Sequence, residues 1–354
     1  MSRRHAYRLK WLLPLLAAAF CGCALVDEDL RDCEADYTMD YDLRLVTNLT
    51  TEIRTQFGLA ADVNVASAIT RQMGAVFSDH AYDVNLSFYD VEGDRERLHH
   101  EKHIMDASQS SYTLFIPVRE YMHLALANLE SNLPAKAEVE PLVKLEGEGF
   151  CGTARLQQPV RDTVESHSVG LYTSRLPMAL KEGVDQQFNV NLYMANCASA
   201  LVIDTLDSHI KKLEVLAAGF ATAFDVADST YLYQYTPVVR TRQAVVEDQP
   251  NHPLVFTCVN FPSRTEDTKT VIDTTDPDVV AADKALWYYV IHCTLGNGTI
   301  TETKLGVRLP LLPGQFKIIT AYIIGDGSAV PEAPYVGASV KLNWNPGMDW
   351  DVEL

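Results

Sequence analysis

The histidines of "HHEKH" at 99–103 are the side chains best suited to bind a metal ion. His99 and His103 lie four positions apart with Glu101 between them, so on a helix both imidazoles could reach one zinc ion. Helical zinc peptidases carry HExxH, however, and here the last histidine follows the glutamate by only two positions. On a strand the same three side chains would share one face with Arg97, and we interpret the stretch as the solvated face of a hairpin. Capture of a metal ion at the surface is the alternative.

Two stretches bring serine and histidine together, "ESHSVG" at 165–170 and "DTLDSH" at 204–209. A catalytic triad is assembled in space rather than by neighbours in sequence, and the chain contains no GxSxG elbow. Gly325 and Gly327 are followed by neither a lysine nor a predicted helix, so they are typical of a turn rather than of a phosphate-binding loop. The sequence therefore predicts no enzyme, no cofactor and no metal site.

Cys23 is the residue for which the sequence predicts a covalent modification. Residues 11–20 are apolar, about half the length needed to cross a bilayer, and they follow a basic start, as in a secretory signal. A lipoprotein peptidase needs a small residue before the cysteine that carries the lipid; glycine precedes Cys23, whereas phenylalanine precedes Cys21. We predict a lipoprotein signal peptide over 1–22 and lipidation of Cys23. Cleavage after an alanine, with both cysteines left as thiols, is the alternative.

The charge of the chain excludes one class of partner. Removing residues 1–22 takes four of the 29 basic residues and no acidic one, which leaves 25 against 47 and a formal net charge of −22. Nucleic-acid binding needs clustered basic charge, so no nucleic-acid partner is expected. The acidic residues after Cys23 predict a hydrated, extended tether over 23–36.

Five cysteines follow Cys23, and no two of them have CxxC spacing, so neither a zinc site nor a thioredoxin-like motif is indicated. Cys258 and Cys293 lie inside apolar runs and are predicted to be small core residues. Cys33 could fasten the tether to the first domain. The sequence does not determine how the five pair: Cys33, Cys151, Cys197, Cys258 and Cys293.

The rest of the chain shows mostly the two-residue periodicity of half-buried strands. Residues 82–94 alternate and end in a turn, and residues 112–126 predict two strands that are separated at Pro117. The clearest alternation is that of Phe188, Val190, Leu192 and Met194.

Only residues 61–77 predict a helix, because Val65, Ile69, Met73 and Val76 recur near helical spacing. After residue 196 short apolar runs separated by turn residues begin again, which predicts a second all-β unit. We therefore expect an N-terminal β-sandwich domain over 37–195 and a C-terminal β-sandwich domain over 196–354.

These segments together resemble the fimbrial anchor lipoproteins of the FimB type, from anaerobic Gram-negative bacteria. The resemblance covers residues 23 to about 203 and is carried by a strand-end motif and a longer strand motif. Their residues here are Tyr89, Asp90 and Gly93, and then Leu114, Pro117, Tyr121, Ala127 and Asn128. The resemblance implies two transthyretin-like β-sandwich domains in tandem, with one short helix in the first. It further implies an outer-membrane lipoprotein at the base of a fimbrial shaft, with the shaft subunits as partners.

Strand edges are the expected means of holding the shaft, because unpaired backbone groups there can accept a partner strand. We expect the docking strand at the C-terminus, where Trp350, Val352 and Leu354 alternate with acidic residues. The alternative is that this segment is the last strand of the second sandwich's own sheet.

A glycan-binding surface lipoprotein is the alternative function. Aromatic side chains would then form exposed platforms, although in alternating strands they are more often core or edge residues. The candidates are Tyr231, Tyr233, Tyr235, Trp287, Tyr288, Tyr289, Trp344 and Trp350.

Overall fold

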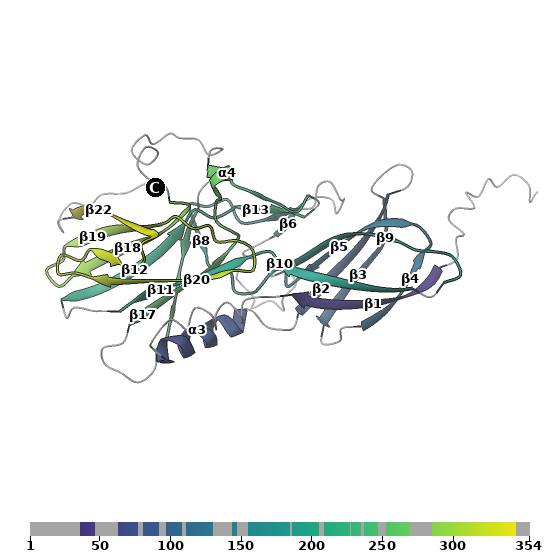
Figure 1. The fold of residues 1–354 in the computed structure, drawn as a ribbon, viewed down its shortest axis with the longest axis horizontal. Helices are drawn as coiled ribbons and strands as arrows, with labels where there is room; N and C mark the ends of the chain where they lie inside the picture. The colour runs from purple at the N-terminus through teal and green to yellow at the C-terminus, as the bar shows by residue number, and fades with distance from the viewer. Residues whose placement is uncertain are drawn as a thin grey trace, which may run out of the picture.

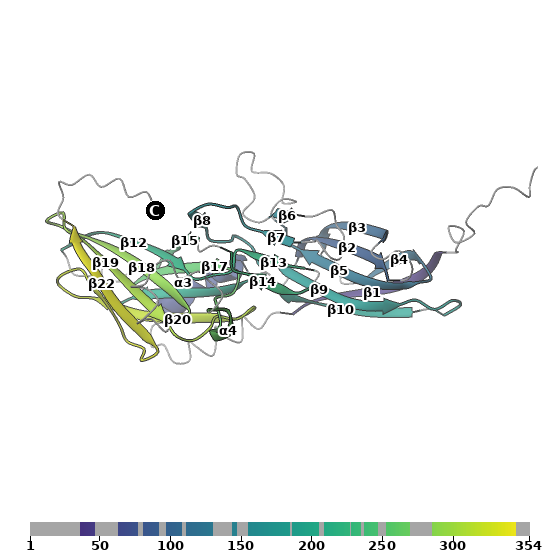
Figure 2. The same ribbon diagram turned by 90° about the horizontal axis from the view of Figure 1, so that it is seen from above.

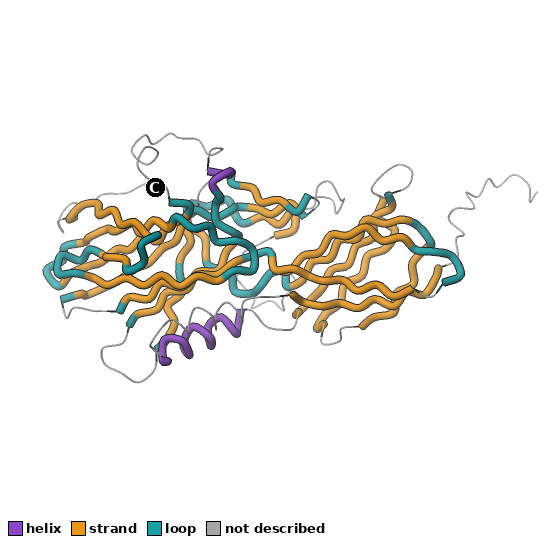
Figure 3. The backbone as a smooth tube through the Cα atoms, in the orientation of Figure 1, coloured by secondary structure: helices purple, strands orange, loops and turns teal. Residues whose placement is uncertain are grey.

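The computed structural model describes residues 36–46, 63–76, 81–91, 97–107, 111–129, 144–146, 155–184, 186–204, 209–226, 228–234, 237–246, 253–269 and 285–344. Within these ranges the chain forms four β-sheets and two helices, arranged as an elongated molecule with a lobe at each end (Figures 1 and 3). The predicted all-β class is confirmed.

One lobe consists of a seven-stranded sheet with the strand order β3-β2-β5-β9-β10-β1-β4. We call it the first sandwich, because the sheet folds over on itself. Its strands are β1 Asp36–Val46, β2 Ala81–Asp90, β3 Arg97–Ala107, β4 Ser111–Pro117, β5 Glu120–Ala127, β9 Tyr172–Ala179 and β10 Gln186–Met194. β9 and β10 are paired at only two positions, and the outermost strands β3 and β4 come into contact. The sheet is therefore folded into two layers that enclose a core.

Alternation along the strands explains which side chains fill this core. In β10, Val190, Leu192 and Met194 are buried while the residues between them are exposed, as predicted. β2 likewise buries its apolar residues at 84, 86 and 88. Asp83, which the alternation assigns to the polar face of β2, is also buried.

Two further sheets face each other in the other lobe and form the second sandwich (Figure 2). The five-stranded sheet consists of β16 Arg242–Ala244, β17 Leu254–Asn260, β11 Cys197–Ile203, β20 Phe316–Ile323 and β21 Ala329–Pro331. The six-stranded sheet consists of β22 Val336–Trp344, β19 Ile300–Val307, β18 Trp287–Leu295, β12 Ile210–Ala218, β15 Val238–Arg240 and β8 Thr163–Glu165. Trp287 and Tyr289 of one sheet and Leu201 and Ile319 of the other are fully buried in the core between them.

A small four-stranded sheet lies where the two lobes meet (Figure 2). Its strands are β14 Thr230–Leu232, β13 Ala223–Asp225, β7 Arg155–Gln157 and β6 Lys144–Glu146. Beside it, Tyr89 and Leu126 of the first sandwich share an apolar cluster with Phe224 and Phe261 from later in the chain. A shared core therefore holds the two sandwiches together.

Helix α3, Val63–Val76, confirms the helix predicted over 61–77 and lies between β1 and β2 in sequence. In space it covers the five-stranded sheet of the second sandwich (Figure 1). Its buried Ile69 and Met73 belong to the same apolar cluster as Val259 of β17, and Arg71 donates a hydrogen bond to the backbone carbonyl of Val245 at 2.7 Å. The helix is thus part of the first domain in sequence and of the second sandwich in packing.

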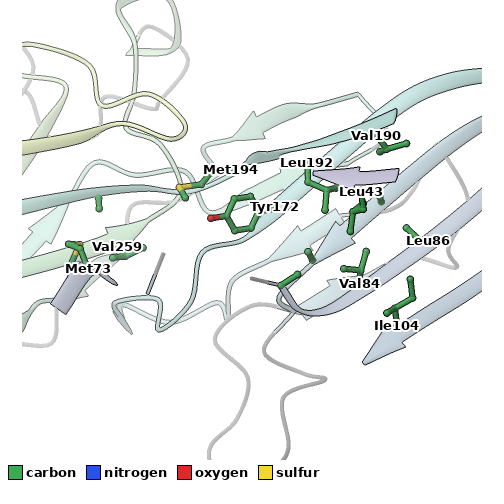
Figure 4. Packing of buried hydrophobic residues seen from close by; sticks show 14 of the residues in the cluster. Leu43, Met73, Val84, Leu86, Ile104, Tyr172, Val190, Leu192, Met194 and Val259 are labelled. Atoms are coloured by element: carbon green, nitrogen blue, oxygen red, sulfur yellow. The ribbon is translucent and has the colours of Figure 1, made fainter. Parts of the chain in front are cut away.

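Because α3 covers one face of the five-stranded sheet and the sandwich core covers the other, every residue of β11 is buried. Figure 4 shows Met73 and Val259 on one side, Leu43 and Leu86 on the other, and Met194 between them. One continuous core therefore runs from the first sandwich to the helix.

The predicted boundary between residues 195 and 196 falls between the end of β10 and the start of β11. The short strands β6, β7 and β8 precede this boundary, yet β7 pairs with β13 and β8 pairs with β15, which both follow it. The domain boundary remains a proposal. The helix α4, Glu266–Lys269, is a single turn, and no helix in the described ranges is long and apolar enough to span a membrane.

Candidate functional site

β1 is the first described strand after the predicted tether, and it is an inner strand of the seven-stranded sheet, next to the edge strand β4. It pairs in parallel with β10 on one side and antiparallel with β4 on the other. Met39, Tyr41 and Leu43 point into the core and are buried. Cys23 and the predicted tether over 23–36 lie almost entirely outside the described residues, so lipidation of Cys23 stays a prediction.

A buried hydrogen bond connects β1 to the opposite layer of the first sandwich. The Tyr41 hydroxyl lies 2.6 Å from Nε2 of His123 in β5, and Nδ1 of the same ring lies 3.0 Å from the Ser87 carbonyl oxygen in β2. Because a carbonyl can only accept, Nδ1 carries the proton, and Nε2 accepts the proton of the tyrosine hydroxyl. The ring of His123 also stacks on Phe88 at 4.3 Å between centroids.

Burial controls the protonation of this pair. It lowers the pKa of His123 to about 4, and the hydrogen bond to the Ser87 carbonyl opposes this only in part. Burial also raises the pKa of Tyr41 far above its usual range. The pair is therefore neutral at neutral pH, and it is a structural contact between β1, β2 and β5.

The outer face of β1 is held by a second group of hydrogen bonds. Asp42 accepts hydrogen bonds from Ser111 Oγ of β4, at 2.6 Å, and from Gln187 Nε2 of β10. These bonds, first that from Ser111 and then that from Gln187, lower the pKa of Asp42 below its usual range. Thr113 of β4 makes a longer hydrogen bond, of 3.4 Å, to Asp40. Side chains therefore tie β1 to both of its neighbouring strands.

The three cysteines in the described ranges are all free and buried. Burial raises the pKa of Cys258 to about 12 and also raises those of Cys197 and Cys293, so all three are unreactive thiols. The prediction that Cys258 and Cys293 are core residues is confirmed. Cys33 and Cys151 lie outside the described residues.

The "HHEKH" stretch is in strand β3, which confirms a strand and excludes the helical arrangement. The backbone register pairs Glu101 with Ser87 and His103 with Asn85, while His99 is the extra residue at a bulge. In the part of the chain described with side chains, no three His, Cys, Asp or Glu residues come together to hold a metal ion. The side chains of this stretch are outside that part. That they form a solvent-exposed strand face therefore stays a prediction.

The "ESHSVG" stretch lies at the junction of the sandwiches. Ser166 Oγ accepts a hydrogen bond from the backbone N–H of Val259 at 2.9 Å, and the His167 ring packs edge-on against Phe261. Asn196, which links β10 to β11, donates to the carbonyl of Val169 at 3.0 Å. These buried polar groups bond mainly to backbone and fix the junction.

β22 is the described strand nearest to the predicted docking segment. It pairs with β19 and lies at the edge of the six-stranded sheet, and no described strand is hydrogen-bonded to its other side. Trp350, Val352 and Leu354 lie outside the described residues, so the docking strand stays a prediction.

Four of the aromatic residues considered as glycan platforms pack in the core or against it. Tyr288 is half-buried, and Tyr235, Trp350 and the side chain of Trp344 lie outside the described part of the chain. Trp287 and Tyr289 are completely buried, and Trp287 Nε1 donates to the Leu309 carbonyl at 3.0 Å. Tyr231 and Tyr233 are partly buried and donate their hydroxyls to backbone carbonyls. Packing thus explains the alternation of these four residues, and glycan binding stays an alternative.

The contacts of Tyr41, His123 and Asp42 were not predicted from the sequence. The alternation of "YDLRLV" indicates a strand with Tyr41 and Leu43 on one face, but it does not identify the partners of that face. Those partners are about 70 to 145 residues away in the chain. No local pattern could have indicated them.

No protein-family model and no curated protein matches this sequence. Among solved structures, a candidate polysaccharide-binding protein from Bacteroides thetaiotaomicron is 11% identical with a TM-score of 0.50, over 85% of this chain and 97% of that one. A candidate adhesin from Bacteroides ovatus is 11% identical with a TM-score of 0.48, over 92% and 99%. A fimbrial anchor protein from Porphyromonas gingivalis is 11% identical with a TM-score of 0.45, over 87% and 100%. The fold implied by the sequence resemblance is confirmed, and this chain shares the fold of the Bacteroides thetaiotaomicron structure over most of its length.

Proposed function

We propose that this chain is an outer-membrane lipoprotein that joins a fimbrial shaft to the cell surface. The observation that carries this proposal is the position of the two ends of the described fold. β1, which follows the predicted tether, and β22, which precedes the predicted docking segment, lie in opposite lobes of an elongated molecule (Figures 1 and 2). A lipid on Cys23 would then hold one lobe at the membrane and leave the other lobe free to meet the shaft.

The place of β1 in the sheet supports a role as a fixed anchor. Met39, Tyr41 and Leu43 are core residues, so loss of β1 would open the first sandwich. Cleavage after the tether would also separate the folded part from Cys23. The anchor therefore keeps this strand, and its partner contact is made elsewhere.

That contact is proposed at the C-terminal segment, next to the edge strand β22. A strand laid on a sheet edge gains main-chain hydrogen bonds, and its alternate side chains enter pockets of the partner. Trp350, Val352 and Leu354 are the side chains that would enter such pockets. The partners proposed are the fimbrial shaft subunits.

The alternation allows a matched pair of variants to test this role. We expect replacement of Trp350, Val352 and Leu354 by alanine to release fimbriae into the medium while this protein stays in the membrane fraction. Replacement of Asp349, Asp351 and Glu353 by alanine changes the other face of the same segment and should leave fimbriae on the cells. Equal retention of fimbriae in both variants and wild type would remove the C-terminal segment from the mechanism.

A further inference from the structure

β1 and β10 form a long parallel ladder that supplies most of the backbone pairing of β10 in the first sandwich. Their paired positions run from Met39 opposite Gln186 to Val46 opposite Tyr193, eight in all. On its other side β10 pairs with β9 at only two positions. Pulling β10 out of the sheet therefore means breaking its ladder with β1.

The two strands leave this ladder at opposite ends. The predicted tether enters β1 at Asp36, whereas β10 ends at Met194 and continues after two residues into β11. β11 is buried along its whole length between the second sandwich core and α3. Figure 1 shows β1 and β10 side by side, with β10 running toward the second lobe.

We infer that the β1–β10 ladder is a mechanical clamp that carries tension between the membrane tether and the second sandwich. Because the strands are parallel and pulled from opposite ends, the load acts along the ladder and falls on all its hydrogen bonds together. If both strands were pulled from the same end, the bonds would break one after another at a lower force. The inference deepens the proposed anchoring function, since a shaft anchor is loaded along this direction.

Side chains on both faces of β1 resist its sliding along β10. Inside the sandwich the Tyr41 hydroxyl is bonded to His123 at 2.6 Å, and outside it Asp42 accepts from Ser111 and Gln187. For β1 to slip past β10 by one residue, these bonds must break and buried side chains must turn toward solvent. The clamp therefore couples backbone shear to the loss of specific contacts.

Single-molecule pulling tests the clamp without any fimbria, so its failure is distinguishable from failure of the proposed anchoring role. The mature chain is held by a handle at position 23, and a second handle is placed at the exposed Lys211 of the second sandwich, which loads the ladder in shear. In the comparison the second handle is at the exposed Glu182, next to the start of β10, which unzips the ladder. We expect the first sandwich to unfold at a force at least about twofold higher in the shear geometry.

Variants of the outer contacts distinguish the clamp from general stability. Ser111→Ala with Gln187→Ala should lower the shear force more than the unzipping force, whereas the exposed Asn189→Ala should change neither. Equal forces in the two geometries would overturn the inference.

Discussion

The hydroxyl of Tyr41 and Nε2 of His123 lie 2.6 Å apart in the core of the first sandwich, and both side chains are fully buried. This bond connects the strand that follows the predicted tether to β5 in the opposite layer. We expect Tyr41→Phe to destabilise the protein by about 1–3 kcal/mol, because Nε2 is left buried without its donor. Chemical denaturation measures this change.

Tyr193→Phe is the matched control for that variant. Tyr193 is 58% exposed on β10, so loss of its hydroxyl should change the free energy of unfolding by no more than about 0.5 kcal/mol. A similar effect of both substitutions would show that the Tyr41–His123 bond contributes nothing specific.

The lowered pKa of His123 predicts a dependence of stability on pH. The folded state keeps this ring neutral down to about pH 4, whereas the unfolded chain takes up a proton below about pH 6.5. The unfolded state therefore binds more protons between these values, and stability falls as the pH drops through this window and levels off below it. The total contribution is about 3 kcal/mol.

Denaturation of wild type and His123→Gln across this pH range separates the contribution of His123 to the pH dependence of stability from the contribution of the carboxylates. The variant should have a flatter profile between pH 6.5 and 4. Parallel profiles for the two proteins would contradict the burial of a neutral histidine.

Packing of α3 predicts that a substitution early in the chain destabilises the second sandwich. Met73→Ala removes a fully buried side chain beneath the five-stranded sheet and should cost about 2–5 kcal/mol. All tryptophans after the predicted signal peptide follow residue 286, so their fluorescence reports on the C-terminal half of the chain.

Thr70→Ala serves as the control on the exposed side of the same helix. It should leave the tryptophan transition within about 0.5 kcal/mol of wild type. If Met73→Ala also left that transition unchanged, the helix would not be part of the second sandwich in solution.

The histidines of β3 give a prediction about metal. His99→Ala and His103→Ala should each change stability by no more than about 0.5 kcal/mol if this stretch is a solvated strand face. Zinc bound in stoichiometric amount by the wild-type protein, and lost in these variants, would instead establish a surface metal site.

The sequence predicted individual elements better than their partners. Alternation at Val190, Leu192 and Met194 identified β10, and helical spacing at Ile69 and Met73 identified α3. An apolar helix face shows only that something covers it, so the position of α3 on the second sandwich could not be predicted. The same limit applies to the partners of Tyr41, because long-range contacts leave no local pattern.

The short strands at the junction were also beyond sequence reasoning. β7 and β8 have three residues each, too few for a periodicity to be recognised. Their pairing with β13 and β15 depends on the way the two sandwiches meet. The burial of Cys258 and Cys293, by contrast, could be predicted, because both lie inside apolar runs.

The most direct test of the anchoring proposal is the distribution of fimbriae between cells and medium in a strain that carries Cys23→Ser. Two acyl chains give an attachment that the tether alone does not, so this variant should leave the membrane with its domains folded. The account predicts that fimbriae appear in the medium and that shaft subunits co-purify with the released protein, while Cys21→Ser leaves both on the cells. If the Cys23→Ser protein left the membrane and the fimbriae stayed on the cells, the anchoring proposal would be contradicted.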